Sequence, residues 1–309
     1  MKVNCFIIGA AKSGSTSLYH YLNQHPEVYF SPIKETNYFS KEINIDDLSA
    51  NYKKNNPINL DKYFSADTLE ELPLAIVQKK AHYEKLFQAA SDEKIRAEAS
   101  VSYMYSPVAA NEIFKYNPEA KLIAILRNPI ERAFSHYLMA LRFGYTSLPF
   151  RDAFDADRNA KNKGWGVSEL FYELGLYHQQ LSRFYELFPK ENIQIHLFED
   201  FHQDKNTLFQ SIFEFLALNP IEINTETVHN PSEVPKNPGF NKVIYRSGIA
   251  KVAKHIFPKS IKSGLKSQML SKDKPKINDA DRNYLLELYR DEILASQKLI
   301  NRDLSEWLK

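Results

Sequence analysis

A lysine between two glycines, surrounded by hydroxyl side chains, is the first group of residues in the chain that could do chemistry. Lys12 lies between Gly9 and Gly14, after an apolar run and before an amphipathic stretch. Four hydroxyl residues surround it: Ser13, Ser15, Thr16 and Ser17. Backbone N–H groups in the first turn of a helix have no partner within that helix and carry partial positive charge, so they attract phosphate or sulfate. The lysine adds a mobile positive charge, and the segment therefore predicts an anion-binding loop between a strand and a helix.

The loop differs from the phosphate-binding loop of nucleoside triphosphatases, G-x-x-x-x-G-K-[ST], in the position of its lysine. Gly9 and Gly14 keep the glycine spacing, but Ser15 stands where that lysine would be. The sequence also shows no clear acidic residue at a strand end that would bind Mg²⁺ with such a loop. A sulfuryl group carries less negative charge than a terminal phosphoryl group and has less need of a metal. An ATP-dependent kinase or nucleotide hydrolase with an atypical loop stays open as the alternative, as does a structural corner with an exposed lysine.

A second candidate group lies in "LRNPIERAFSHY", residues 126–137. Arg127 ends a predicted strand, and Ser135 lies on the helix predicted to follow it. Arginine can make a two-pronged contact with a phosphate, and a serine nearby can add a further hydrogen bond. Because ligands of open parallel sheets bind at the carboxyl ends of strands, both candidate groups are expected to face one crevice. Taken alone, Arg127 could equally be a structural ion-pair partner.

Alternating strands and helices are predicted to position these residues. The strands are expected at residues 3–8 and in "KIRAEAS", "KLIAILRNP" and "NIQIHLFED". The helices are expected at residues 15–24, 74–90, 107–116, 129–142, 168–188, 205–218 and 279–308, with Asn128 capping the fourth and a proline-rich surface loop after Asn219. This order predicts an α/β fold with a central parallel sheet flanked by helices. Residues 1–309 are expected to form a single domain, with a core at about 3–245 and a helical C-terminal extension at 246–309.

The composition favours an ordinary globular protein. Of 309 residues, 43% are hydrophobic and 25% charged, and the net charge of +2 gives no case for nucleic-acid binding. The stretch from Lys251 to Lys276 is rich in lysine and could recruit an anionic polymer or a membrane surface, although a solvated face is the ordinary interpretation. No apolar run approaches the ~20 residues of a membrane span. The single cysteine, Cys5, is expected to be a buried core residue, and these features together favour a cytoplasmic protein.

The two candidate groups together resemble the PAPS-dependent sulfotransferases. The resemblance rests on "GAAKSGSTSLYHYLNQHPEVYFSPIKETNYFS" and "LRNPIERAFSHY". It is greatest to the glycosaminoglycan (heparan sulfate) sulfotransferase type and its bacterial relatives, and weaker similarity extends over most of residues 3–245. The resemblance implies a single α/β domain that uses 3′-phosphoadenosine 5′-phosphosulfate (PAPS) as donor, releases 3′-phosphoadenosine 5′-phosphate (PAP) and requires no metal.

The resemblance also implies roles for individual residues. The stretch from Lys12 to Ser17 matches the P-loop-like loop for the 5′-phosphosulfate, with Lys12 stabilising the leaving phosphate. Arg127 and Ser135 match the site for the 3′-phosphate. Glu35, in "SPIKETNYF", matches the general base of the glycosaminoglycan type. A solvated surface charge is the alternative for Glu35, in which case another group would be the base.

The acceptor is implied only as a class: a hydroxyl or amine of a sugar, a glycolipid or a lipid-like alcohol. Glu98 is followed by Ala99, where the glycosaminoglycan type tends to have a lysine, so a heparan-like acceptor is less expected. Four aromatic residues could line the acceptor pocket or belong to the core: Tyr38, Phe39, Trp165 and Tyr172. The histidines His20, His25 and His136 are interpreted as ordinary helix and loop residues. A nucleotide-binding relative without catalytic activity is a further hypothesis.

Overall fold

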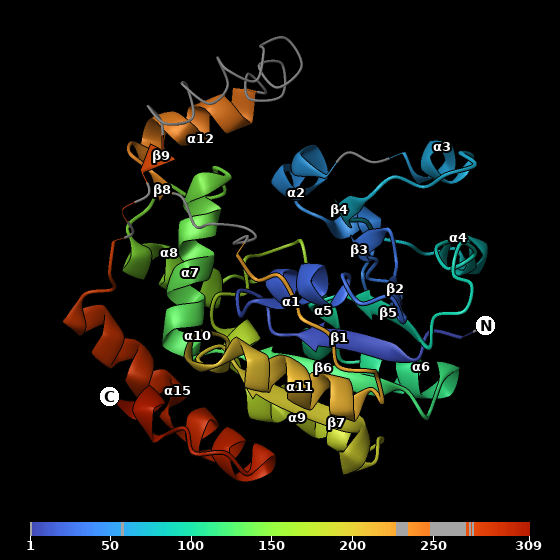
Figure 1. Cartoon of the computed structure of the whole chain (residues 1–309). Coiled ribbons are helices and arrows are strands. Elements are labelled where there is room, and N and C mark those ends of the chain that lie inside the picture. Colours follow the sequence, from blue (N-terminus) through green and yellow to red (C-terminus); the bar gives the residue numbers. More distant parts are fainter. Residues whose placement is uncertain (1, 57–58, 227–233, 248–269, 272, 274) are drawn as a thin grey trace.

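A five-stranded parallel sheet lies at the centre of the chain, with helices on both faces (Figure 1). The computed structural model describes residues 2–56, 59–226, 234–247, 270–271, 273 and 275–309. The strand order in the sheet is β2–β5–β1–β6–β7. The strands are β1 (Cys5–Gly9), β2 (Val28–Phe30), β5 (Ile95–Ala99), β6 (Lys121–Leu126) and β7 (Ile193–Leu197). The predicted α/β fold with a central parallel sheet is therefore confirmed.

The central strands are apolar on both sides because both faces of the sheet are covered. In β1, Phe6 and Ile8 pack into the core on one face, and Cys5 and Ile7 pack into the core on the other. Cys5 is 1% exposed, and burial raises the pKa of its thiol to about 12, so it is a core residue, as predicted.

The helices that follow β1 and β6 cover opposite faces of the sheet. Helices α1 (Ser15–Leu22) and α11 (Lys205–Phe215) cover the face to which Cys5 and Ile7 point. The other face is covered by α6 (Ala109–Tyr116), α7 (Pro129–Arg142), α9 (Tyr177–Tyr185) and α15 (Asp279–Ile300). The chain therefore leaves the adjacent strands β1 and β6 in opposite directions. Such a switch point is where open α/β sheets bind their ligands.

Shorter elements surround this frame. Strands β3 (Ile33–Glu35) and β4 (Leu72–Leu74) form a parallel pair, and β8 (Val234–Pro235) and β9 (Leu270–Ser271) an antiparallel pair. The remaining α-helices are α2 (Ala50–Asn55), α3 (Leu60–Phe64), α4 (Lys80–Lys85), α5 (Ser102–Tyr105), α8 (Phe150–Arg158), α10 (Asp200–Gln203) and α12 (Pro238–Ser247). The 3₁₀ turns are η1 (Ile45–Asp47), η2 (Glu173–Gly175), η3 (Lys190–Asn192) and η4 (Ser305–Leu308).

Two predicted helices are largely wrong because tertiary hydrogen bonds override their periodicity. In residues 74–90, Ala75 N–H donates to Glu35 O (2.9 Å) and Val77 N–H to Thr36 O (2.9 Å), which keeps the chain extended until α4. In residues 168–188, the Asp157 carboxylate accepts the N–H groups of Glu169 and Phe171, each at 2.8 Å. The chain between them passes through a left-handed residue, so the helix begins only at α9.

The C-terminal part also differs from the prediction. Helix α12 begins at Pro238, inside the expected proline-rich loop, and its Asn241 donates to Leu141 O and Arg142 O at the end of α7, both at 2.9 Å (Figure 1). The predicted last helix is interrupted at Asn301, which has a φ of 50°. Most of the lysine-rich stretch 251–276 lies outside the described residues. Among the described helices, none has an apolar length that could cross a bilayer.

We expect Gly175→Ala to destabilise the fold. A Cβ at Gly175 would lie 2.8 Å from the Tyr289 ring and 3.0 Å from Pro129 Cβ, between α15 and α7. Overpacking of this kind costs about 1–3 kcal/mol in the free energy of unfolding, which denaturant titration measures. In the control Gly164→Ala, the new Cβ would meet Val167 at 3.5 Å, and the free energy should stay within about 1 kcal/mol of wild type. Equal stability of both variants would contradict this packing.

Candidate active site

The loop between β1 and α1 lies at the switch point. Its Ala10 N–H donates to Ile125 O of β6 at 2.7 Å, which ties the start of the loop to the adjacent strand. Lys12 and Gly14 both have left-handed backbones, with φ of 67° and 100°, and a φ of 100° favours glycine. Helix α1 starts directly after Gly14, so its first N–H groups, which have no acceptor within the helix, point out of the loop. The strand–loop–helix order of the prediction is present.

Exposure divides the hydroxyl residues of this loop into two kinds. Ser13 is 0% exposed and Ser15 5%, whereas the side chains of Lys12, Thr16 and Ser17 are half-buried. Ser13 N–H donates to Ala10 O (3.3 Å), so Ser13 shapes the loop. The side chains of Lys12, Thr16 and Ser17 are therefore the more accessible ones of the loop, and the predicted ligand contacts of Ser13, Gly14 and Ser15 stay predictions.

Arg127 meets the loop from the neighbouring strand. Its Nη1 donates to Lys12 O at 3.3 Å, across 115 residues of sequence. The guanidinium lies 4.6 Å from the centre of the Phe198 ring, and the Arg127 carbonyl accepts the Tyr177 hydroxyl at 2.7 Å. Burial lowers the pKa of Arg127 from its usual value, because desolvation disfavours the charged form. The Arg127 guanidinium thus contacts the backbone of the loop that carries Lys12, at the carboxyl ends of β1 and β6.

Helix α7 brings Ser135 to the same side. The helix starts where the sequence predicts, with Pro129 in its first turn and Asn128 Oδ1 accepting Ile130 N–H at 3.0 Å. Lys12 Nζ lies 3.7 Å from the sulfur of Met139 on this helix. Ser135 is half-buried and stands four residues before Met139, and residues at this spacing share one face of a helix. Ser135 therefore lies on the face of α7 that Lys12 contacts.

Glu35 lies at the end of β3, on a different element from Lys12 and Arg127. Its Oε1 accepts Lys34 Nζ at 2.7 Å, and the Glu35 side chain is 19% exposed. Lys34 is itself buried, at 5% exposed. The negative charge of Glu35 adds to the burial that raises the pKa of Tyr52, so the two side chains are neighbours. Glu35 is therefore a half-buried, ion-paired carboxylate.

The sequence missed Tyr52 and left the role of Trp165 open, and the structure brings the two side chains together. The ring of Tyr52 packs against the backbone at Gly166, where a Cβ would meet it at 3.2 Å. Tyr52 stands in the polar stretch between β3 and β4, where nothing in the local pattern marks it. Trp165 directly precedes Gly166 in the chain, and its ring centre lies 6.5 Å from that of Tyr105. Tyr52 and Trp165 therefore form one aromatic group, and Tyr52 is close enough to Glu35 to feel its charge.

The other aromatic and histidine candidates have structural contacts. Phe39 is 3% exposed in the core, and the Tyr38 ring stacks on Tyr83 at 4.0 Å. The His25 ring bonds to Asn219 O at 2.8 Å. The candidates Tyr172 and His136 are also packed within the fold, Tyr172 against Tyr289 and His136 against Phe171.

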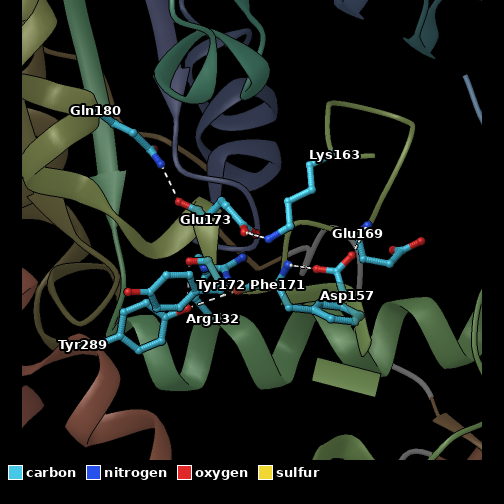
Figure 2. A network of polar contacts seen from close by, with 9 residues as sticks. All are labelled: Arg132, Asp157, Lys163, Glu169, Phe171, Tyr172, Glu173, Gln180 and Tyr289. Atoms are coloured by element: carbon cyan, nitrogen blue, oxygen red, sulfur yellow. Dashed lines mark hydrogen bonds and ion pairs between the residues drawn. The ribbon is translucent and has the colours of Figure 1, made fainter. Parts of the chain in front are cut away.

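A polar network holds the backbone at Phe171, in the stretch that follows Trp165 (Figure 2). Arg132 of α7 is fully buried, and its Nη2 donates to Phe171 O. Tyr289 of α15 donates to the same carbonyl at 3.1 Å, and Asp157 of α8 accepts Phe171 N–H at 2.8 Å. Three helices therefore fix one stretch of irregular backbone beside the site.

The chain matches one family model and is similar to several curated proteins. The model of the sulfotransferase family matches residues 5–222. Carbohydrate sulfotransferase 15 of Mus musculus is 28% identical over 267 residues, which cover 74% of this chain and 46% of that protein. Bifunctional heparan sulfate N-deacetylase/N-sulfotransferase 1 of Xenopus laevis is 24% identical over 323 residues, covering 98% of this chain and 30% of that protein. The chain thus spans less than half the length of these curated relatives.

A solved structure shares the fold over its whole length. The crystal structure of a sulfotransferase from Alicyclobacillus acidocaldarius superposes with a TM-score of 0.70 at 24% identity, covering 100% of both chains. At this identity the likeness concerns the fold.

We expect Glu169 to titrate far from the usual range of a carboxyl. Burial, with a smaller effect of the Asp157 charge, raises its pKa to about 8. The folded protein therefore binds this proton more tightly than the unfolded chain, whose glutamate pKa is about 4.3. The stabilisation is complete below that value and is lost as the pH rises toward 8.

The measurement is the free energy of unfolding between pH 5 and 9 in wild type and Glu169→Gln. The wild type should lose stability relative to the variant as the pH rises. The Glu169 side chain is 27% exposed, so the direction of the trend is predicted and not its size. A constant difference between the two proteins would contradict the raised pKa.

Proposed function

Because the chain belongs to the sulfotransferase family, we propose that it transfers a sulfuryl group from PAPS to a hydroxyl or amine of a carbohydrate or related acceptor. Sulfuryl transfer follows from the family; the donor, the acceptor and the roles of single residues are the proposal. The observation that carries it is the contact of Arg127 Nη1 with Lys12 O at 3.3 Å. Two anion-binding elements on adjacent strands suit a donor that carries anionic groups at two positions.

The residues present fit the two ends of PAPS. The 5′-phosphosulfate would lie at the first turn of α1, where N–H groups, Thr16, Ser17 and the Lys12 ammonium can donate to it. The 3′-phosphate would lie at Arg127, whose guanidinium offers paired donors, with the Ser135 hydroxyl adding one more. PAP keeps both phosphates after transfer and would remain at the same residues until it is released.

The reaction would be an in-line displacement at sulfur. The acceptor oxygen or nitrogen forms a bond to sulfur while the bond from sulfur to the phosphate oxygen breaks, and PAP leaves with that electron pair. Lys12 and the N–H groups of α1 would stabilise the charge that develops on the leaving phosphate. Glu35 would take the proton of the acceptor, and its ion pair with Lys34 holds the carboxylate in one place.

No step of this mechanism requires a metal. The charge on the leaving phosphate would be met by Lys12 and the N–H groups of α1, and the charge of the 3′-phosphate by Arg127, all supplied by the chain. The position of the lysine before Gly14 separates this loop from that of ATP-dependent enzymes, which pair a lysine after the glycine with Mg²⁺. We therefore propose metal-independent use of PAPS over the alternative of an ATP-dependent kinase.

The acceptor is proposed to be a carbohydrate or a glycolipid. The relatives' names refer to carbohydrate and heparan sulfate substrates. The aromatic surface of Tyr52 and Trp165 near Glu35 offers an apolar wall with polar edges, as sites for small ligands commonly do.

The proposed location of the protein is the cytoplasm. Its Cys5 is a free, buried thiol, which suits a reducing compartment.

We expect Glu35→Gln to abolish most sulfuryl transfer from PAPS to a panel of sugar and lipid alcohols. Loss of a general base lowers kcat by about 10²- to 10⁴-fold, while the affinity for PAP should stay unchanged because the donor contacts lie on other elements. The matched control is Glu112→Gln on α6, whose ion pair with Lys115 lies at the surface. Near wild-type turnover in Glu35→Gln would show that another group is the base. Absence of transfer from PAPS by the wild type to any acceptor would count against the donor or the acceptor class.

A further inference from the structure

Glu98 is a fully buried carboxylate in β5 that none of the described lysines or arginines contacts. It is 0% exposed, and its partners are four hydroxyl groups. Oε1 accepts Thr36 Oγ1 at 2.5 Å, Ser100 Oγ at 2.9 Å and the Tyr103 hydroxyl. Oε2 accepts the Tyr83 hydroxyl at 2.5 Å. A buried carboxylate is costly unless hydrogen bonds compensate it, and this one has four.

The direction of these hydrogen bonds is fixed by the chemistry of the groups. An ionised carboxylate only accepts, so each hydroxyl must give its single proton to Glu98. The hydroxyl oxygens keep lone pairs that can accept from elsewhere. Burial raises the pKa of Glu98, and the four hydroxyl donors oppose that effect. Each hydroxyl oxygen can therefore accept a hydrogen bond from another group while its own proton is donated to Glu98.

Three of these oxygens accept three successive backbone N–H groups. Ser100 Oγ accepts Asn37 N–H at 3.1 Å. Thr36 Oγ1 accepts Tyr38 N–H at 3.2 Å, and the Tyr103 hydroxyl accepts Phe39 N–H at 3.3 Å. All three bind Glu98 through Oε1, whereas Tyr83, on Oε2, accepts none of them. We call Glu98 with Thr36, Ser100 and Tyr103 the Glu98 clamp.

The backbone that the clamp holds follows directly on Glu35. Glu35 O accepts Ala75 N–H at 2.9 Å on the side of β4. Asn37, with a left-handed φ of 55°, donates its side-chain amide to Glu35 O at 3.2 Å and to Ala75 O at 2.8 Å. The turn after Glu35 is thus fixed by β4 on one side and by the clamp on the other. A shift of residues 37–39 would move the Glu35 carboxylate.

We propose that Glu98 is a positioning residue, which acts through Thr36, Ser100 and Tyr103 to fix the Glu35 carboxylate. The inference rests on the proposed role of Glu35 as the base. Misplacement of a reacting group by about 1 Å can cost roughly 10²-fold in rate. An apolar residue at position 98 could fill the same space, but it would leave the three hydroxyls without a common acceptor that sets their direction.

Two tyrosines provide a matched pair for the test. Tyr83→Phe and Tyr103→Phe each remove one hydroxyl from Glu98 in a fully buried site. Only Tyr103→Phe also removes a contact within the clamp, that with Thr36 Oγ1 at 3.1 Å, and releases a backbone N–H of the turn, that of Phe39. A merely structural role for the carboxylate predicts equal effects of the two variants.

The first readouts are kcat for sulfuryl transfer and the Kd of PAP. We expect Tyr103→Phe to lower kcat by roughly 10- to 100-fold and Tyr83→Phe by less than about twofold, with the Kd of PAP unchanged in both. Hydrogen exchange of the amides of residues 37–39 should become faster only in Tyr103→Phe. Equal kcat and equal exchange in the two variants would overturn the proposal.

A double variant tests whether the clamp acts through Glu35, separately from the question whether Glu35 is the base. If Tyr103 acts through Glu35, Tyr103→Phe adds no further loss of kcat in the Glu35→Gln background. Full additivity of the two losses would overturn the proposal. High activity of Glu35→Gln alone would instead refute Glu35 as the base, and faster exchange in Tyr103→Phe would then still establish the clamp on the turn.

Discussion

The opposite departure of α1 and α7 from the adjacent strands β1 and β6 is the constraint on which the donor side of the site depends. Parallel strands end at the same edge of a sheet, so the loop after β1 and Arg127 after β6 must lie together there. Because one helix leaves above the sheet and the other below it, the space between the two strand ends is not filled by either helix. Lys12 and Arg127 meet in this position although 115 residues separate them.

The proposed acceptor side lies across β1 from Arg127. In the strand order, β5 flanks β1 on one side and β6 flanks it on the other, and Glu98 of β5 pairs in register with Phe6 of β1. The loop that carries Lys12 therefore starts from the strand between the two neighbours. One neighbour contributes a guanidinium, and the other contributes a carboxylate that holds the turn after Glu35. Arg127 and Glu98 therefore lie on opposite sides of β1.

Local sequence patterns predict much of the central sheet and of α7. The Asn128–Pro129 start of α7 follows from capping and the fixed φ of proline, and the apolar runs of β1, β6 and β7 follow from burial on both faces. The 168–188 helix failed because Asp157, from an element that the sequence did not reveal, captures N–H groups that the helix would use. The clamp was equally out of reach: residues 36, 98, 100 and 103 meet only through tertiary pairing, and a lone glutamate in "KIRAEAS" carries no sign of its partners.

Calorimetric titration with PAP, with and without EDTA and against ATP plus Mg²⁺, would decide whether the chain has the proposed donor site. We expect tight binding of PAP that EDTA does not change, weaker binding of adenosine 5′-phosphate, and loss of that preference in Arg127→Ala. In Lys12→Ala, binding of both nucleotides should weaken, because the lysine lies at the 5′ end that they share. Preference for ATP with Mg²⁺, or a preference for PAP that survives in Arg127→Ala, would contradict a donor site built from the β1 loop and the end of β6.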